Sequence, residues 1–172
     1  MLSVFLQVAA LGSLALLLIR WRADIARRNA QSWETLLSRI RSDWSGREFT
    51  DQFLWKEGLN ATPEEVWSRV QGPCGLWAMY QNANVMQEMA DYAARSNEDV
   101  DRLLVATLHS DALQIRICVL AALSQYAFSR ASEGVRVNAF RAASMYTGMA
   151  ARMTQLLQES AAVMVPDFVA AM

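Results

Sequence analysis

One cysteine and one histidine are the side chains of this chain best suited to act together as nucleophile and base. Cys74 lies in the sequence Gly72-Pro73-Cys74-Gly75, directly before a predicted helix. Backbone amides and the helix dipole at such a position stabilise a thiolate. His109 is the single histidine of the chain. One hypothesis is therefore a thiol-dependent enzyme or redox protein that uses Cys74. The alternative, which we favour, is that Cys74 is a small turn residue and His109 bonds to a nearby carbonyl group.

Acidic residues offer few ligands for a metal ion. Glu98, Asp99 and Asp101 lie in the first turn of a predicted helix, where the helix dipole alone favours acidic side chains. Glu88 and Asp91 form a second, smaller group. A divalent cation needs several convergent oxygen atoms, and one histidine with two cysteines is too few for a typical zinc site. We predict neither a metal site nor a cofactor.

Apolar side chains at helical spacing form two seams. The first is predicted to pack on the chain's own cytoplasmic domain or on a partner, with a basic amphipathic helix on anionic lipid as the second choice. The second is predicted to be part of the core or a contact for a partner helix, because methionine is common in cores and in adaptable binding grooves. The first seam lies within the basic segment near the N-terminus (residues 20–47), and the second lies on two later predicted helices. The residues are Trp33, Leu37, Ile40 and Trp44 in the first, and Met79, Met86, Met145, Met149 and Met153 in the second.

Composition excludes several classes of protein. Hydrophobic residues make up 53% of the 172 residues and charged residues 19%, which is incompatible with an intrinsically disordered chain. The net charge of −1 argues against nucleic acid as a partner, since phosphate binding needs a basic surface. The charges are unevenly placed, because residues 20–47 carry seven Arg against three acidic residues.

The N-terminal segment is predicted to be a membrane anchor. Residues 2–19 carry no charge, and as a helix they span about 27 Å, close to the thickness of the hydrocarbon core. A cleaved signal peptide would have a basic start and small residues at its end, whereas this run ends in Ile19-Arg20-Trp21-Arg22. We expect a retained, single-pass signal-anchor.

The basic residues after this run predict its direction. Positive side chains favour the cytoplasmic side of a membrane, so the N-terminus is expected outside and residues 20–172 in the cytoplasm, as in a bacterial inner membrane. Both cysteines are then expected to be reduced. The expected membrane-interface residues are Arg20, Trp21, Arg22, Arg27 and Arg28.

Periodicity predicts an all-α protein without strands. We expect a transmembrane helix (residues 1–22) that continues into an amphipathic stalk (23–45), followed by a cytoplasmic helical bundle (46–172). Thr62-Pro63-Glu64-Glu65 has the pattern of a capping box at a helix start. The helices of the bundle are predicted near 50–57, 63–71, 75–95, 98–130 and 133–160, with a break in the fourth near 109–111.

The segment 103–128 is hydrophobic on every face, which predicts a buried central helix. Its neighbours cover it incompletely, so the stalk seam or a partner is expected to complete the wall around it. From these features we predict a membrane-anchored interaction or scaffold module, or an accessory subunit of a membrane complex. Its expected partners are the lipid bilayer and a protein, and we expect no enzymatic activity.

Overall fold

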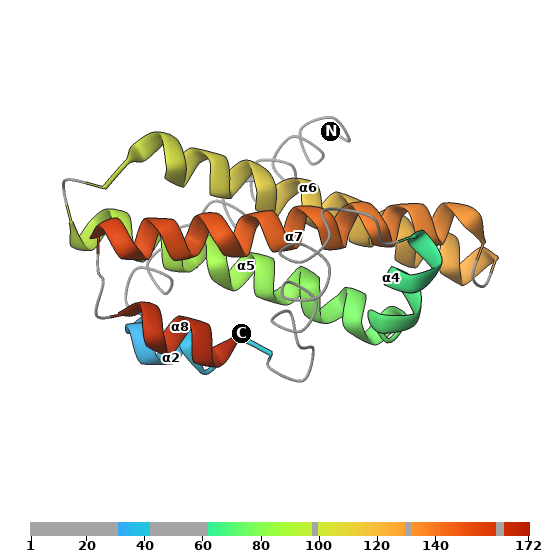
Figure 1. Ribbon diagram of the computed structural model, residues 1–172, viewed down its shortest axis with the longest axis horizontal. Coiled ribbons are helices and arrows are strands. Elements are labelled where there is room, and N and C mark those ends of the chain that lie inside the picture. Colours follow the sequence, from blue (N-terminus) through green and yellow to red (C-terminus); the bar gives the residue numbers. More distant parts are fainter. Residues whose placement is uncertain (1–30, 42–61, 98–99, 130–131, 161–163) are drawn as a thin grey trace, which may run out of the picture. The chain divides into compact units, whose positions relative to one another are not determined.

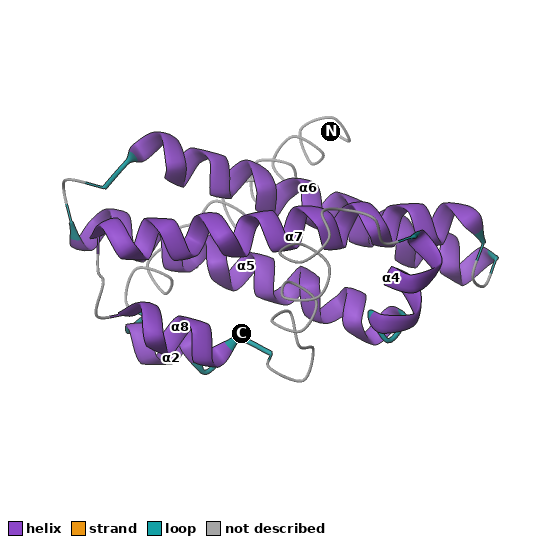
Figure 2. Ribbon diagram, in the orientation of Figure 1, coloured by secondary structure: helices purple, strands orange, loops and turns teal. Residues whose placement is uncertain are grey.

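The structure is a computed structural model that describes residues 31–41, 62–97, 100–129, 132–160 and 164–172. The pattern of contacts divides the chain after Ser32, and the described helices belong to the second unit, Trp33–Met172. Within the described residues the secondary structure is helical and no strand occurs, which confirms the all-α prediction for this part (Figure 2). The helices are α2 (Trp33–Leu37), α4 (Pro63–Arg69), α5 (Pro73–Ser96), α6 (Arg102–Phe128), α7 (Glu133–Ser160) and α8 (Val165–Ala171).

Several predicted features lie outside the described residues. These are the transmembrane helix (residues 1–22), the first part of the stalk (23–30) and the short helix near 50–57. The interface residues Arg20, Trp21, Arg22, Arg27 and Arg28 and the seam residue Trp44 also fall in these segments.

Three long helices, α5, α6 and α7, lie side by side (Figure 1). Short connections join them in sequence, so each runs antiparallel to the one before it. The most extensive contact is between α6 and α7, followed by that between α5 and α6. The shorter α4 packs on α7, whereas α2 packs on α5 and α8.

Helix α5, and not α6, is the most buried element. Twelve residues of α5 are buried, including Leu76, Met79 and Met86 on its predicted apolar face. Only five residues of α6 are buried. The prediction that segment 103–128 is the buried central helix is therefore wrong. A helix that is apolar on all sides need not be covered on all sides, and α6 packs on α5 and α7 along one side only.

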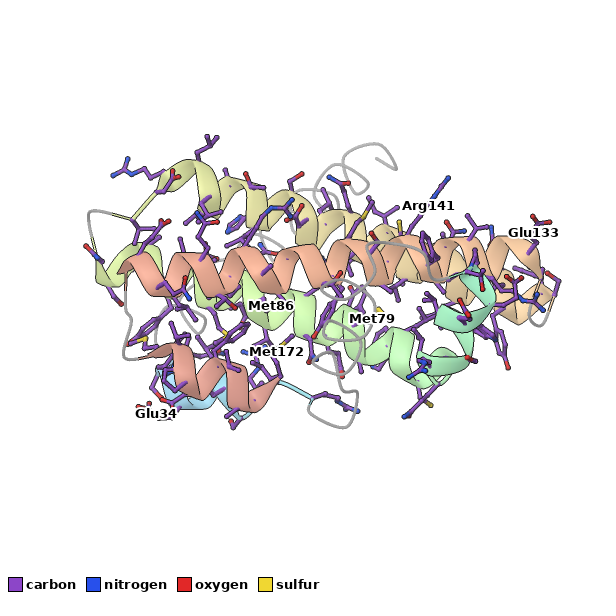
Figure 3. All side chains as sticks on the ribbon, in the orientation of Figure 1. Glu34, Met79, Met86, Glu133, Arg141 and Met172 are labelled. Carbon is purple, nitrogen blue, oxygen red and sulfur yellow. The ribbon has the colours of Figure 1, made fainter. Side chains whose placement is uncertain are left out.

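The two apolar seams lie largely in the core. Trp33 and Ile40 are buried and Leu37 is half-buried, and the Trp33 ring lies 6.0 Å from that of Tyr92 on α5. The stalk seam thus packs on α5 instead of completing a wall around α6. Of the second seam, Met145 is half-buried and the other four residues are fully buried: Met79, Met86, Met149 and Met153. Figure 3 labels Met79 and Met86, which both lie on α5.

The predicted stalk helix ends early in the part that the structure describes. Helix α2 stops at Leu37, although the sequence predicts helix to residue 45. The backbone N–H of Arg41 donates to Oδ1 of Asn82 at 2.8 Å, and Nδ2 of Asn82 donates to the Arg41 carbonyl at 3.2 Å. Asn82 on α5 therefore occupies the backbone groups that Arg41 would use in a continued helix.

Local signals at helix ends are accurate for α4 but not for α6, which was predicted to start near residue 98. Thr62 caps α4 with the predicted capping box, in which its side chain accepts from the Glu65 amide and Glu65 accepts from the Thr62 amide. Helix α6 starts at Arg102, with the Asp101 side chain accepting from the Leu103 amide. It then continues through residues 109–111 without the break that the sequence suggested.

A buried tyrosine makes stability depend on pH in alkaline solution. Tyr146 is 1% exposed, accepts a hydrogen bond from Asn82 and donates one to the sulfur of Met172. Burial raises the pKa of Tyr146 far above its ordinary value, and the bond from Asn82 opposes this shift only in part. The folded chain therefore keeps a proton that the unfolded chain loses.

We predict that this group makes the free energy of unfolding fall by about 1.4 kcal/mol per pH unit above about pH 10. Below about pH 10 both states hold the proton and the group gives no pH dependence. Thermal melts of the chain followed by circular dichroism between pH 8 and 11 measure this. The matched variant Tyr146→Phe should have a smaller slope, and an equal slope in both proteins would contradict the assignment.

Candidate interaction surface

One side of α6 is exposed and carries no charge. Eight residues recur at alternating spacings of three and four, and every one of them is exposed. Four of them are large and apolar, with Leu103 75% exposed and Ile117 57% exposed. We call these eight residues the α6 outer face: Leu103, Ala106, Ser110, Leu113, Ile117, Leu120, Ser124 and Ala127. Phe128 extends it and is 93% exposed.

The opposite side of α6 is apolar as well and packs on the neighbouring helices. Its buried residues have spacings of four and three, which place them on the far side of the helix from the outer face. They are Leu108, Ala112, Ile115, Val119 and Ala122. The helix thus has two apolar sides, one packed inside the protein and the other exposed.

The ionisable side chains in the middle of α6 point toward the neighbouring helices and form hydrogen bonds with their side chains. Arg116 donates to Gln87 at 2.9 Å and to Asn84 at 3.4 Å, both on α5. On the same side, Nε2 of His109 lies 2.8 Å from Oδ1 of Asp91.

The other flank of α6 has a matching contact, in which Asp111 accepts a hydrogen bond from Arg152 of α7. The Asp111 side chain is 15% exposed. Because each of these charged or polar groups is held at a flank, none reaches the outer face.

The hydroxyl groups on the outer face already have partners within α6. The Ser110 Oγ accepts from the Gln114 side chain at 3.1 Å, and the Ser124 Oγ donates to the Ala121 carbonyl at 2.9 Å. Covering these serines therefore costs less free energy than covering two hydroxyl groups that have no partner.

Helix α6 is also the helix that satisfies the length and composition of a membrane span within the described residues. It has 27 residues, and 22% of its most apolar window is buried. Exposed apolar patches of this kind are common at sites of contact with protein or membrane.

The structure does not bring the two candidate catalytic residues together. Cys74 is exposed in the first turn of α5. His109 bonds to Asp91, which lies 17 residues further along the same helix. At the rise of an α-helix this places the two sites about 25 Å apart. Cys74 and His109 therefore cannot form a catalytic pair in this fold.

The other titratable candidates have structural contacts. Glu88 is buried and pairs with Arg39, and Asp101 caps α6. Cys118 on α6 is half-buried, and burial raises the pKa of its thiol. Among the described residues, no group of three or more His, Cys, Asp or Glu side chains converges as a metal site would require. Glu98 and Asp99 lie outside those residues.

A second surface feature lies beside the start of α5. The rings of Trp77 and Tyr80 stack at 4.9 Å with an interplanar angle of 4°, and Trp77 is 43% exposed. Two open hollows of about 360 and 420 Å³ adjoin them, and both are lined by Arg41 and Trp77. Cys74 lines the larger one. Arg41 is the last described residue before the segment 42–61, so this surface is described only on the α5 side.

Sequence reasoning missed the outer face because it treated hydrophobicity on all sides as a sign of complete burial. The available signal was the position of the ionisable residues. His109, Asp111 and Arg116 fall between the two apolar stripes of α6 and never within the outer one. Separating the stripes in this way would have predicted one packed side and one exposed side.

Comparisons of the chain with protein-family models, curated proteins and solved structures give no match. The functional interpretation therefore depends on the residues and contacts described above.

Proposed function

We propose that this chain is a membrane-anchored α-helical interaction module, which presents the α6 outer face to a protein partner. The observation that carries the proposal is the uncharged, exposed stripe from Leu103 to Ala127 on a helix whose charged groups are all held at its flanks. The uncharged run 2–19, followed by Arg20 and Arg22, supports the anchor. In this proposal residues 20–172 lie on the cytoplasmic side.

A protein partner fits the outer face better than lipid does. Exposed Gln114 and Gln125 border the stripe, and hydrocarbon offers no hydrogen-bond partner for an amide side chain. If α6 itself crossed the membrane, His109, Asp111 and Arg116 would be placed near the middle of the bilayer, where ionisable groups are costly.

The thiol-dependent alternative has less support. Its candidate nucleophile, Cys74, is about 25 Å from the site at which His109 bonds to Asp91. The Asp91 carboxylate that orients His109 is equally distant from the thiol. An interaction role needs no such pairing and uses the surface that the fold leaves exposed.

The proposed topology predicts opposite behaviour of reporters at the two ends. A reporter that is active only in the cytoplasm should be active after Met172 and inactive before Met1. Replacing Arg20, Arg22, Arg27 and Arg28 by neutral residues should give a mixture of both orientations, because these side chains supply the positive-inside bias. A mature chain that begins near residue 24, or a cytoplasmic N-terminus, would contradict the proposed anchor.

The proposed interaction predicts position-dependent crosslinking in membranes. A photo-reactive phenylalanine derivative at Leu113, in the middle of the outer face, should give a protein adduct on irradiation. The matched control is the same group at Ser68, an exposed residue of α4, which packs on α7. Equal yields at the two positions, or no protein adduct at Leu113, would contradict the proposed function.

A further inference from the structure

We propose that the α6 outer face pairs with the same face of a second copy of this chain. The two α6 helices run antiparallel about a two-fold axis that crosses the contact at the level of residue 115. This inference rests on the proposed function, because it names the partner for the same surface. A symmetric contact of this type uses one patch twice, so the patch must be complementary to itself.

The outer face is self-complementary when it is read in opposite directions. About an axis near residue 115, the facing pairs are Leu103 with Ala127, Ala106 with Ser124, Ser110 with Leu120, and Leu113 with Ile117. A large side chain thus faces a small one in the first and third of these layers, two small side chains face each other in the second, and two branched aliphatic side chains meet in the centre. Alternation of large and small residues across facing positions is how helices fill the space between them.

A parallel pair would fill this space unevenly. Each residue would then face its own copy, so that Ser110 faces serine and Ala106 faces alanine, while Leu113 and Leu120 face leucine. A parallel pair has four layers of two small side chains, which leave voids beside layers of two large ones, whereas the antiparallel pair has two such layers, and voids lose packing energy. The distribution of residue sizes along α6 therefore favours the antiparallel arrangement.

Charges at the edges of the proposed contact are already bound within each copy. In the antiparallel register Arg116 of one copy lies nearest Arg116 of the other, with an offset of about 3 Å along the helix axis. Within its own copy, His109 bonds to Asp91 and Arg116 bonds to Gln87, so neither side chain needs a partner across the interface. Between Leu103 and Phe128 no exposed residue of α6 is charged. A face without charge is matched by another such face, since neither leaves an unpaired ion in the contact.

The size of the contact indicates where it forms. The outer face extends over 24 residue steps, which is about 36 Å at the rise of a helix, and a helix with its side chains is about 10 Å wide. The projected area is then about 360 Å² per copy, whereas a standard stable interface buries about 800 Å² per partner. Two chains anchored in one membrane are held at high effective concentration, which strengthens a small contact without added area. The test therefore uses the full chain in lipid.

Reciprocal charges at the centre of the contact distinguish this dimer from other arrangements. Full-length chains carrying a donor or an acceptor fluorophore are mixed in lipid vesicles, and energy transfer reports dimers. Leu113→Glu places two unpaired carboxylates in the contact, and Ile117→Lys places two unpaired ammonium groups there. Each variant alone should weaken dimerisation at least about tenfold, because an unpaired charge is costly to bury. Both positions are exposed within a single copy, at 54% and 57%, so the fold of each chain should persist.

Mixing the two variants should restore energy transfer. In a mixed antiparallel dimer the introduced carboxylate faces the introduced ammonium group, and Leu113 of one copy faces Ile117 of the other. Ser68→Glu, which adds the same charge on α4, should behave as the unmodified chain does. Circular dichroism melts verify that each variant is folded.

Three results would overturn the dimer. These are energy transfer that persists in Leu113→Glu, mixing that fails to restore the signal, and an unmodified chain that gives no transfer. If in addition the photo-reactive group at Leu113 captures a different protein, the proposed function stands and only the second copy is excluded as its partner. Failure of that crosslinking as well would reject both proposals.

Discussion

The polar side chains in the middle of α6 form hydrogen bonds with the helices on either side, and these bonds determine which side of α6 is exposed. Arg116 and His109 are bound by α5, and Asp111 is bound by α7. These bonds fix the rotation of α6, because turning the helix would break contacts on both flanks. With that rotation fixed, one apolar side packs against α5 and α7 and the other must be exposed. The outer face follows from the placement of three polar side chains.

The remaining elements are arranged around α5. Asn82, which is 1% exposed, bonds to the backbone of Arg41 and to Tyr146, and Tyr146 contacts Met172. One buried amide on α5 thus joins the segment after α2, the middle of α7 and the C-terminal residue. Buried polar groups that satisfy each other favour one arrangement over competing ones. Helices α2 and α8 also pack against each other. None of the helices that the structure describes covers the outer face.

The sequence predicted local structure better than it predicted burial. The capping box at Thr62 and the apolar face of α5 were recognisable because helix caps and periodicity are local signals. The early end of α2 was not, since it depends on Asn82, which lies 41 residues from Arg41. The exposure of Leu113 and Ile117 was missed because hydropathy does not tell which of two apolar sides will be packed. The separation of Cys74 from His109 likewise depends on how α5 and α6 pair.

Spin-label distances in lipid nanodiscs report whether two copies of the chain meet through antiparallel α6 outer faces. Single labels are placed at Ser124 or Leu103 of the full chain, with Cys74→Ser and Cys118→Ala removing the native thiols. Along the helix axis, the two labels of an antiparallel dimer are separated by about 27 Å at Ser124 and about 36 Å at Leu103. We expect the distance measured by pulsed electron paramagnetic resonance to increase by about 9 Å from the Ser124 label to the Leu103 label. Equal short distances at both positions, or no dipolar coupling between copies, would contradict the antiparallel dimer.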